Sequence, residues 1–200
     1  MDWLEKYASK VVDAPEAVSK IMRGSRVFIG TGCGEPQHLI RAMVEDQQLH
    51  DIMVYQMLSS TLSQYVEDAS FTRRFSLKLF FISQSMRKAA FEGKIDYIPE
   101  YLSQIPRMFA SHRIGLDAAL VQVSPPDKFG YCSLGVSVDI TRSAVAHSPV
   151  VIAQVNPKMP RTWGDSFVHV DDIDWLVLHD EPLVEALPRI KDNEISRRIG

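Results

Sequence analysis

The chain has 200 residues, of which 46% are hydrophobic and 24% charged, and its net charge at neutral pH is −3. This composition is typical of a globular domain and gives no electrostatic reason to expect a nucleic acid or an anionic membrane as partner. The start, MDWLEKYASK, lacks the apolar stretch of a secretion signal, and no run of about 18 apolar residues predicts a membrane span. Two cysteines and six scattered histidines predict neither a disulfide framework nor a metal site, so a cytoplasmic location is the simplest expectation.

The predicted elements alternate between short apolar strands and amphipathic helices. Asp13 as N-cap predicts a first helix with Ile21 and Met22 on its inward face and Gly24 at its end. The expected strands are, in chain order, 26–30, 52–57, 77–82, 149–155 and 173–178, with two more flanking the motif at 123–135. The further helices are expected from Pro36, over 86–92 with Ser85 as N-cap, and from Asp139 to Ala146. This alternation predicts an α/β domain with a mostly parallel sheet flanked by helices.

A glycine-rich loop, GTGCGEP, connects the first strand to a helix at residues 30–36. The third glycine comes one residue too early for a dinucleotide fingerprint, and the next strand ends in Tyr55-Gln56-Met57 without an acid. The Gly-Lys-Ser/Thr of a P-loop is missing too. The loop is either an ordinary tight turn or a place where bare backbone approaches a ligand. Glu35 is interpreted as a helix-start acid favoured by the helix dipole.

Three other candidates have simpler structural interpretations. Ser85-Met-Arg-Lys88 matches the S-x-x-K of serine acyl enzymes, but a helix cap is the favoured role for Ser85. Cys33 lies where a helix dipole would activate a thiol, yet no base can be assigned to it. His169 alternates with valines, which indicates a polar position on a strand.

The stretch VSPPDKFGYCSLG, residues 123–135, interrupts an apolar run with two prolines. Prolines cannot donate to a central ladder, so they end the strand. Asp127 can accept bonds from the turn backbone, and Gly130 can take a positive φ. These residues predict a stiff hairpin turn.

Together these segments resemble one family. Gly34-Glu35-Pro36, the S-P-P-D-x-x-G-x-x-S-x-G pattern at 124–135 and GDSFVHV at 164–170 are similar, in this order, to the amino-terminal half of the acetyl-CoA hydrolase/transferase family, which includes 4-hydroxybutyrate CoA-transferases. The resemblance implies a NagB/CoA-transferase-like domain over 1–190, with 191–200 beginning a helix toward a second domain. It also implies that a glutamate of that second domain attacks the acyl-CoA thioester.

The resemblance further implies that this half supplies one wall of the acyl or carboxylic-acid pocket. The residues assigned to that wall by position are Gly32, Gly34, Glu35, Pro36, Ser59, Ser60, Ser83, Gln84, Ser85, Pro126, Asp127 and Gly130. A coenzyme A thioester would be the substrate, with no permanently bound cofactor, and the resemblance allows a homo-oligomer. The alternatives are a non-catalytic ligand-sensing NagB-like module, although residues 30–34 lack a basic residue for a phosphate, and a serine acyl hydrolase using Ser85 and Lys88.

Overall fold

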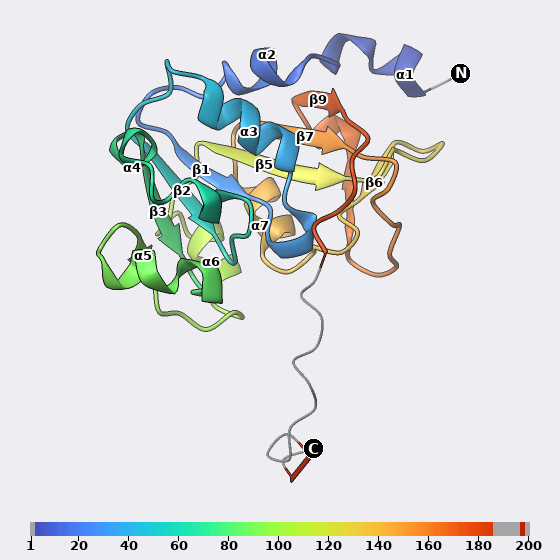
Figure 1. Cartoon of the computed structure of the whole chain (residues 1–200). Helices are drawn as coiled ribbons and strands as arrows, with labels where there is room; N and C mark the ends of the chain where they lie inside the picture. The colour runs from blue at the N-terminus through green and yellow to red at the C-terminus, as the bar shows by residue number, and fades with distance from the viewer. Residues whose placement is uncertain (1–2, 186–196, 199–200) are drawn as a thin grey trace.

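The computed structural model describes residues 3–185 and 197–198. Its centre is a seven-stranded sheet in the order β4-β3-β2-β1-β5-β7-β9, in which every pairing is parallel (Figure 1). In chain order these strands are β1 (Arg26–Ile29), β2 (Ile52–Gln56), β3 (Phe75–Leu79), β4 (Asp96–Tyr97), β5 (Ala118–Val123), β7 (Val151–Val155) and β9 (Trp175–Leu178). The predicted mostly parallel sheet is confirmed.

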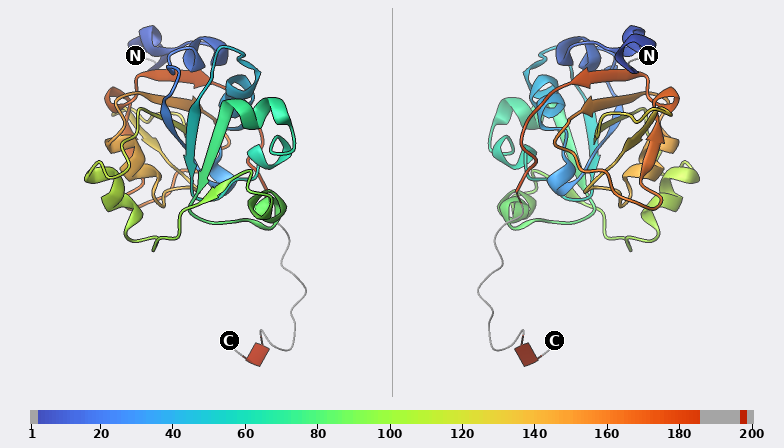
Figure 2. Two further views of the ribbon diagram at one scale, coloured as in Figure 1. Left: turned by 90° about the vertical axis from the view of Figure 1, so that its left-hand side faces the viewer. Right: turned by 90° about the vertical axis from the view of Figure 1, so that its right-hand side faces the viewer.

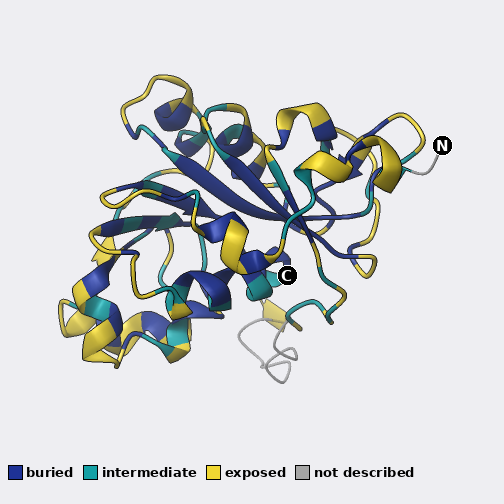
Figure 3. Cartoon of the chain, turned by 90° about the horizontal axis from the view of Figure 1, so that it is seen from above, coloured by how far each residue is buried: buried dark blue, intermediate teal, exposed yellow. Residues whose placement is uncertain are grey.

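Helices cover both faces of the sheet, so the fold has three layers (Figure 1). The α-helices are α1 (Trp3–Lys6), α2 (Ala14–Val18), α3 (Gln37–Glu45), α4 (Ala69–Arg74), α5 (Arg87–Phe91), α6 (Ile105–Ala110) and α7 (Thr141–Ala146). Helices α2, α3, α4 and α5 pack into one hydrophobic core, and α6 and α7 pack into the other. Every residue of β5 and β7 is buried, as expected for parallel strands covered on both faces (Figure 3).

A small antiparallel ribbon completes the second face. Its strands are β6 (Tyr131–Ser133) and β8 (Phe167–His169), with Cys132 opposite Val168. At one edge of the main sheet, the N-terminal segment lies along β9, where the Val12 N–H donates to the Leu176 carbonyl at 3.0 Å (Figure 2). Pairing and covering such an edge removes unpaired backbone groups that would otherwise attract other chains.

Several local predictions are confirmed. The Asp13 carboxylate accepts from the Glu16 N–H at 2.8 Å and starts α2. Helix α7 ends at Ala146 as expected, but its N-cap is Ile140; Asp139 lies one residue earlier, and its carboxylate accepts from the Thr141 N–H at 3.0 Å. These signals succeed because a cap acts within three residues and needs no tertiary contact.

Other local predictions are wrong. Helix α2 ends at Val18, so Met22 is 75% exposed and does not face inward. Ser85 does not cap α5, because residues Gln84–Met86 form a 3-10 turn (η4) and Ser85 Oγ bonds to Ser83 Oγ at 2.9 Å instead. Val136 is in no strand, and the ladder of β6 is with β8. The predicted hairpin turn itself is present, because the Ser124 N–H donates to the Ser133 carbonyl and the Asp127 N–H to the Tyr131 carbonyl, both at 2.9 Å.

The sequence interpretation missed three short helices and one edge strand. Helix α1 has four residues, α4 and α6 have six each, and β4 has two. Elements this short carry less than two helical turns or one strand period of hydrophobic pattern. The helix expected over 191–200 lies outside the described residues, apart from 197–198.

Candidate functional site

The predicted site residues lie at one edge of the sheet. Parallel strands point the same way, and the loops after β1, β2, β3 and β5 therefore leave from their shared carboxyl edge. Strand β1 lies between β2 and β5, and β3 lies beside β2. The sheet order thus brings together the glycine loop, the two serine-containing segments and the Pro-Pro-Asp turn.

The glycine loop is held from behind by the segment before α7. Residues Gly32–Gly34 form a 3-10 turn (η2), and a Cβ built on Gly34 would lie 2.3 Å from the Cβ of Ser137. The Ser137 hydroxyl donates to the Thr31 carbonyl at 2.8 Å, and the Thr31 hydroxyl bonds to the Asp139 carboxylate. Gly34 is therefore required by the close approach of two loops more than 100 residues apart in the chain.

Glu35 is fully buried and connects two loops of the candidate site. Its carboxylate accepts from the N–H groups of Ser60 at 2.6 Å and Thr61 at 2.7 Å and from the Gln56 side-chain amide at 3.1 Å. Burial raises the pKa of Glu35, and the hydrogen bonds from Thr61, Ser60 and Gln56 offset part of that rise. The prediction that Glu35 acts as an acid at the start of its own helix is therefore wrong. Glu35 instead holds the loop after β2 through Ser60 and Thr61.

The serine-rich segments after β2 and β3 divide into buried and exposed positions. Ser59 is fully buried, and its carbonyl accepts from the Ser83 hydroxyl at 3.3 Å. Ser60, Gln84 and Ser85 are exposed. These three side chains and the half-buried Ser83 can therefore contact a ligand, while Ser59 lies behind the surface.

Ser85 and Lys88 do not form an S-x-x-K dyad. Lys88 Nζ pairs with the Glu67 carboxylate at 3.1 Å, and Ser85 bonds to Ser83. The ion pair raises the pKa of Lys88, first through its hydrogen bond with Glu67, which is opposite to what a general base needs. The structure thus removes the basis for the serine hydrolase alternative.

The Pro-Pro-Asp turn is rigid for reasons that the sequence showed only in part. The Asp127 carboxylate accepts from the N–H groups of Phe129 at 2.9 Å and Tyr131 at 3.0 Å, and Gly130 has a φ of +91°, as predicted. Arg161, which the sequence interpretation missed, donates to the Asp127 carboxylate at 3.0 Å and to the Tyr131 carbonyl at 3.0 Å. A guanidinium with several acceptors locks the turn more firmly than the turn backbone alone can.

The contacts of His169 and Cys33 indicate structural roles and no catalytic ones. His169 Nε2 lies 3.0 Å from the Phe129 carbonyl and Nδ1 accepts from the Asp171 N–H, so its ring supports the same turn. Cys33 is a free, half-buried thiol in η2. A 3-10 turn of three residues does not provide the helix dipole that was expected to activate this thiol.

A network of buried side-chain amides underlies the carboxyl edge and was also missed. Gln56, Gln122 and Gln154 are all buried near the ends of β2, β5 and β7. The Gln122 amide donates to the Glu35 carbonyl at 2.8 Å, and Gln154 Nε2 lies 3.4 Å from Gln122 Oε1. A glutamine inside an otherwise apolar strand was the signal that could have revealed it, because a buried amide needs partners.

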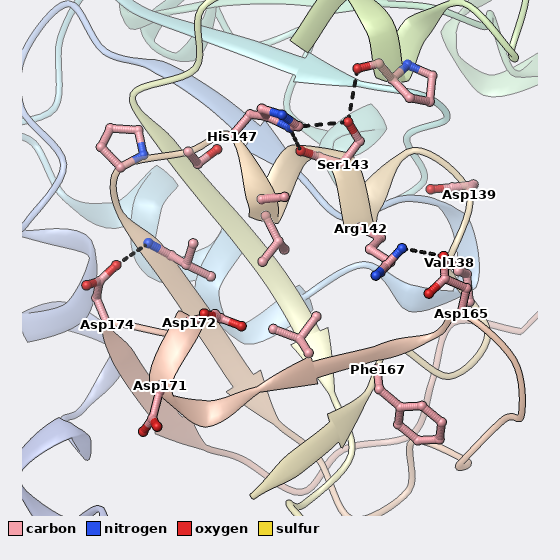
Figure 4. A pocket seen from close by; sticks show the side chains of 17 residues that line it. Val138, Asp139, Arg142, Ser143, His147, Asp165, Phe167, Asp171, Asp172 and Asp174 are labelled. Carbon is pink, nitrogen blue, oxygen red and sulfur yellow. Dashed lines mark hydrogen bonds and ion pairs between the residues drawn. The ribbon is translucent and has the colours of Figure 1, made fainter. Parts of the chain in front are cut away.

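A cavity of about 890 Å³ lies elsewhere, between α7 and the segment that runs from β8 into the 3-10 turn η5 (Val170–Asp172) (Figure 4). Its lining includes the Arg142–Asp165 ion pair and His147, whose Nδ1 is 2.8 Å from the Ser143 carbonyl. None of the predicted site residues lines it. The cavity is therefore separate from the candidate site.

Residues 3–185 and 197–198 contain neither a metal-binding cluster nor a membrane-spanning helix. Nowhere in these ranges do three or more histidine, cysteine or carboxylate side chains gather so as to hold a metal ion. No described helix is both long and apolar enough to cross a membrane.

Comparisons of the sequence with known proteins point to one family. The model of the acetyl-CoA hydrolase/transferase N-terminal domain matches residues 1–188. The 4-hydroxybutyrate coenzyme A transferase of Clostridium kluyveri is 40% identical, over the whole chain and 46% of that enzyme, and the succinyl-CoA:acetate/propanoyl-CoA:succinate CoA transferase of Fasciola hepatica is 35% identical, over 98% of the chain and 40% of that enzyme. The chain thus spans about half the length of these relatives, or less.

Solved structures show the same arrangement. RipA from Yersinia pestis superposes with a TM-score of 0.86 and 28% identity, over 96% of this chain and 47% of that one. The 4-hydroxybutyrate CoA-transferase of Porphyromonas gingivalis superposes with a TM-score of 0.71 and 30% identity, over 94% of this chain and 43% of that one. The predicted CoA-transferase-like fold is confirmed. The chain therefore belongs to the acetyl-CoA hydrolase/transferase family and corresponds to its N-terminal domain.

Proposed function

We propose that this chain, as a domain over residues 1–190, forms one wall of an acyl-CoA and carboxylic-acid pocket. The other wall and the reactive glutamate would lie in a second α/β domain of the same transferase. Relatives that are about twice as long and are named as CoA transferases support this proposal.

The observation that carries the proposal is where the described chain exposes large apolar side chains. Three of them, Leu4, Met22 and Phe91, lie away from the carboxyl edge of the sheet. The others lie at or after the carboxyl ends of sheet strands: Phe81, Tyr97, Tyr101, Leu102, Phe129, Tyr131, Val136, Trp163 and Leu178. Trp163 is 95% exposed and Tyr101 79%. Large apolar groups left exposed in the segments that follow several strands favour a partner that covers these segments.

The predicted wall residues would then have two different roles. Those that reach the surface, and so could contact acyl-CoA or the acid, are Gly32, Ser60, Ser83, Gln84, Ser85 and Asp127. Those that are buried, and so could only hold the wall in place, are Gly34, Glu35, Pro36, Ser59, Pro126 and Gly130. Glu35 is thus a supporting residue in this proposal and not the nucleophile.

The chemistry follows from a carboxylate attacking a thioester. A glutamate oxygen of the second domain would bond to the thioester carbonyl carbon, the C–S bond would break, and coenzyme A would leave as a thiolate. The thiolate would next attack the glutamyl carbonyl of the resulting anhydride and release the first acid. A carboxylate is a weak nucleophile, so the reaction needs a pocket closed to water. This requirement explains why neither half would suffice alone.

The test compares this chain alone with the same chain linked to the glutamate-bearing second half. Each is incubated with acyl-CoA and treated with borohydride or hydroxylamine, and the adduct is located by mass spectrometry. We expect a trapped glutamyl thioester on the second half of the linked protein and no turnover by the chain alone. Hydrolysis of acyl-CoA by this chain alone, lost in Ser85→Ala, would instead support the serine mechanism. An active two-domain enzyme without any adduct would refute the covalent pathway.

A further inference from the structure

The order in which the chain adds strands to the sheet reverses between β1 and β5, so the crevice between these two strands is the topological switch point of the fold. From β1 the chain proceeds through α3 toward β2 on one side, and from β5 it proceeds through α7 toward β7 on the other. Open α/β folds bind ligands in such a crevice, and the N-terminus of the following helix attracts anions there. The N-terminus of helix α3, which has nine residues, lies beside the end of β7, where the His38 N–H donates to the Gln154 side-chain oxygen at 3.1 Å.

The chain fills this position with a carboxylate of its own. Glu181 Oε1 accepts from the His38 N–H at 3.1 Å and from the Gln154 side-chain amide at 2.7 Å. Glu181 Oε2 accepts from the Arg41 guanidinium at 2.7 Å. The Glu181 side chain is only 12% exposed. A backbone N–H of the first helical turn, a buried amide and a guanidinium form the kind of donor set that binds a free carboxylate.

The segment that carries Glu181 is tied down at both sides. We call residues 179–185 the strap. The Asn156 amide donates to the Glu181 carbonyl at 2.7 Å, and the Gln37 amide donates to the Pro182 carbonyl at 2.9 Å. The rings of His179 and His38 stack with centroids 3.8 Å apart and planes at 7°. The strap therefore covers the N-terminus of α3 and the end of β7.

Two of the three donors, the His38 N–H and the Gln154 amide, do not depend on the strap for their positions. Helix α3 is anchored by the fully buried Leu39 and Ile40, and Gln154 is part of the all-buried strand β7. Gln154 Oε1 also accepts from the His38 N–H at 3.1 Å, which holds its amide group in place. Because these two groups belong to the core, we expect them to keep their positions when the carboxylate is removed.

We propose that the α3 N-terminus, Arg41 and Gln154 form a carboxylate-binding site that the chain occupies with Glu181. A small free carboxylate binds there only when Glu181 is absent or the strap is displaced. The site is distinct from the acyl pocket proposed above, and it explains why a phosphate- or sugar-phosphate-sensing role is disfavoured: the position for the anion is taken.

Chemical rescue tests the proposal in the 200-residue chain. Glu181→Ala removes the carboxylate and leaves space for acetate, so we expect its Tm to be lower than that of the wild type. Sodium acetate at pH 7 should raise that Tm saturably by several degrees, whereas sodium chloride at equal ionic strength should not. The wild type and the control Glu185→Ala, which changes an exposed acid of the same strap, should show no acetate-specific response. Arg41→Met added to Glu181→Ala should abolish the rescue.

A second measurement decides the case if Glu181→Ala does not fold. Glu181→Gln keeps the size of the side chain but replaces one acceptor oxygen with a donor. Its Tm should fall, and the fall should be much smaller when Arg41→Met is already present, because the carboxylate–guanidinium contact is then already lost. Equal falls in the two backgrounds, or equal effects of acetate and chloride on Glu181→Ala, would overturn the proposal. Both readouts are independent of acyl-CoA chemistry.

Discussion

Gly34→Ala tests how tightly the glycine loop is held against the segment before α7. The new Cβ would lie 2.3 Å from Ser137 Cβ and 3.1 Å from its Oγ. Carbon atoms in van der Waals contact are about 3.5–4.0 Å apart, so the two loops must move apart by roughly 1 Å or more. The separation would stretch the bonds between Ser137 Oγ and the Thr31 carbonyl and N–H, now 2.8 and 3.3 Å.

The expected cost adds overpacking to weakened hydrogen bonds. Overpacking a tight contact costs about 1–3 kcal/mol, and each weakened hydrogen bond costs about 1 kcal/mol. We therefore expect Gly34→Ala to lower the free energy of unfolding by about 3–5 kcal/mol, a large part of the roughly 5–15 kcal/mol available to a domain. The control Gly24→Ala places a Cβ in open space at a φ of +81°, and should cost only about 1–2 kcal/mol of backbone strain.

Urea unfolding followed by circular dichroism measures these differences. The decisive variant is Ser137→Gly, which removes the clashing Cβ and alone should cost about 2 kcal/mol through its lost hydroxyl bonds. If the clash is the cause, Gly34→Ala combined with Ser137→Gly should be scarcely less stable than Ser137→Gly alone. Additive effects, within about 0.5 kcal/mol, would refute the reasoning.

Three further predictions concern thiols, the turn and the buried acid. Burial raises the pKa of Cys132 to about 12, so at pH 8 a thiol reagent should modify only the half-buried Cys33 in the native chain and both cysteines in denaturant. Arg161→Lys removes the forked donor of the Pro-Pro-Asp turn and should speed trypsin cleavage after Lys128; unchanged cleavage would contradict its bracing role. The folded-state pKa of Glu35 lies above its ordinary 4.5, so ionisation of Glu35 lowers the free energy of unfolding as pH rises from about 4.5 through the folded value. Glu35→Gln should remove this pH dependence from urea unfolding measured between pH 4 and 8. An unchanged pH dependence would contradict the assignment.

The parts of the fold that follow from local pattern were predictable. Continuous apolar runs such as AALVQV and VIAQV predict buried strands, because parallel strands are covered on both faces. The Asp127 and Gly130 turn was predictable for a similar reason, since its bonds close within four residues. Boundaries were less accurate. The strand expected over 77–82 is Phe75–Leu79, and the helix expected over 86–92 is Arg87–Phe91, with a 3-10 turn in place of its predicted Ser85 cap.

The candidate site was predictable only as a set of loops. Its place at the carboxyl edge follows from strand direction, but the sequence interpretation assigned Glu35 to its own helix and missed Arg161, Gln154 and Glu181. Glu35 bonds to residues 25 positions away, and Arg161 to a carboxylate 34 positions away. Partners at such separations leave no periodic signal in the chain, so composition and spacing could not reveal them.

The sequence by itself determined the class of fold, the sites of the main turns and the family to which the chain belongs. Each depends on hydrophobic period, on capping and turn chemistry, or on an ordered motif, all of which act within a dozen residues or so. The tertiary structure decided that β6 pairs with β8, that Ser137 excludes a side chain at Gly34, and that Glu181 fills the crevice beside α3. The physical reason is that burial and hydrogen-bond satisfaction are settled between segments distant in sequence, after the sheet order has brought them together.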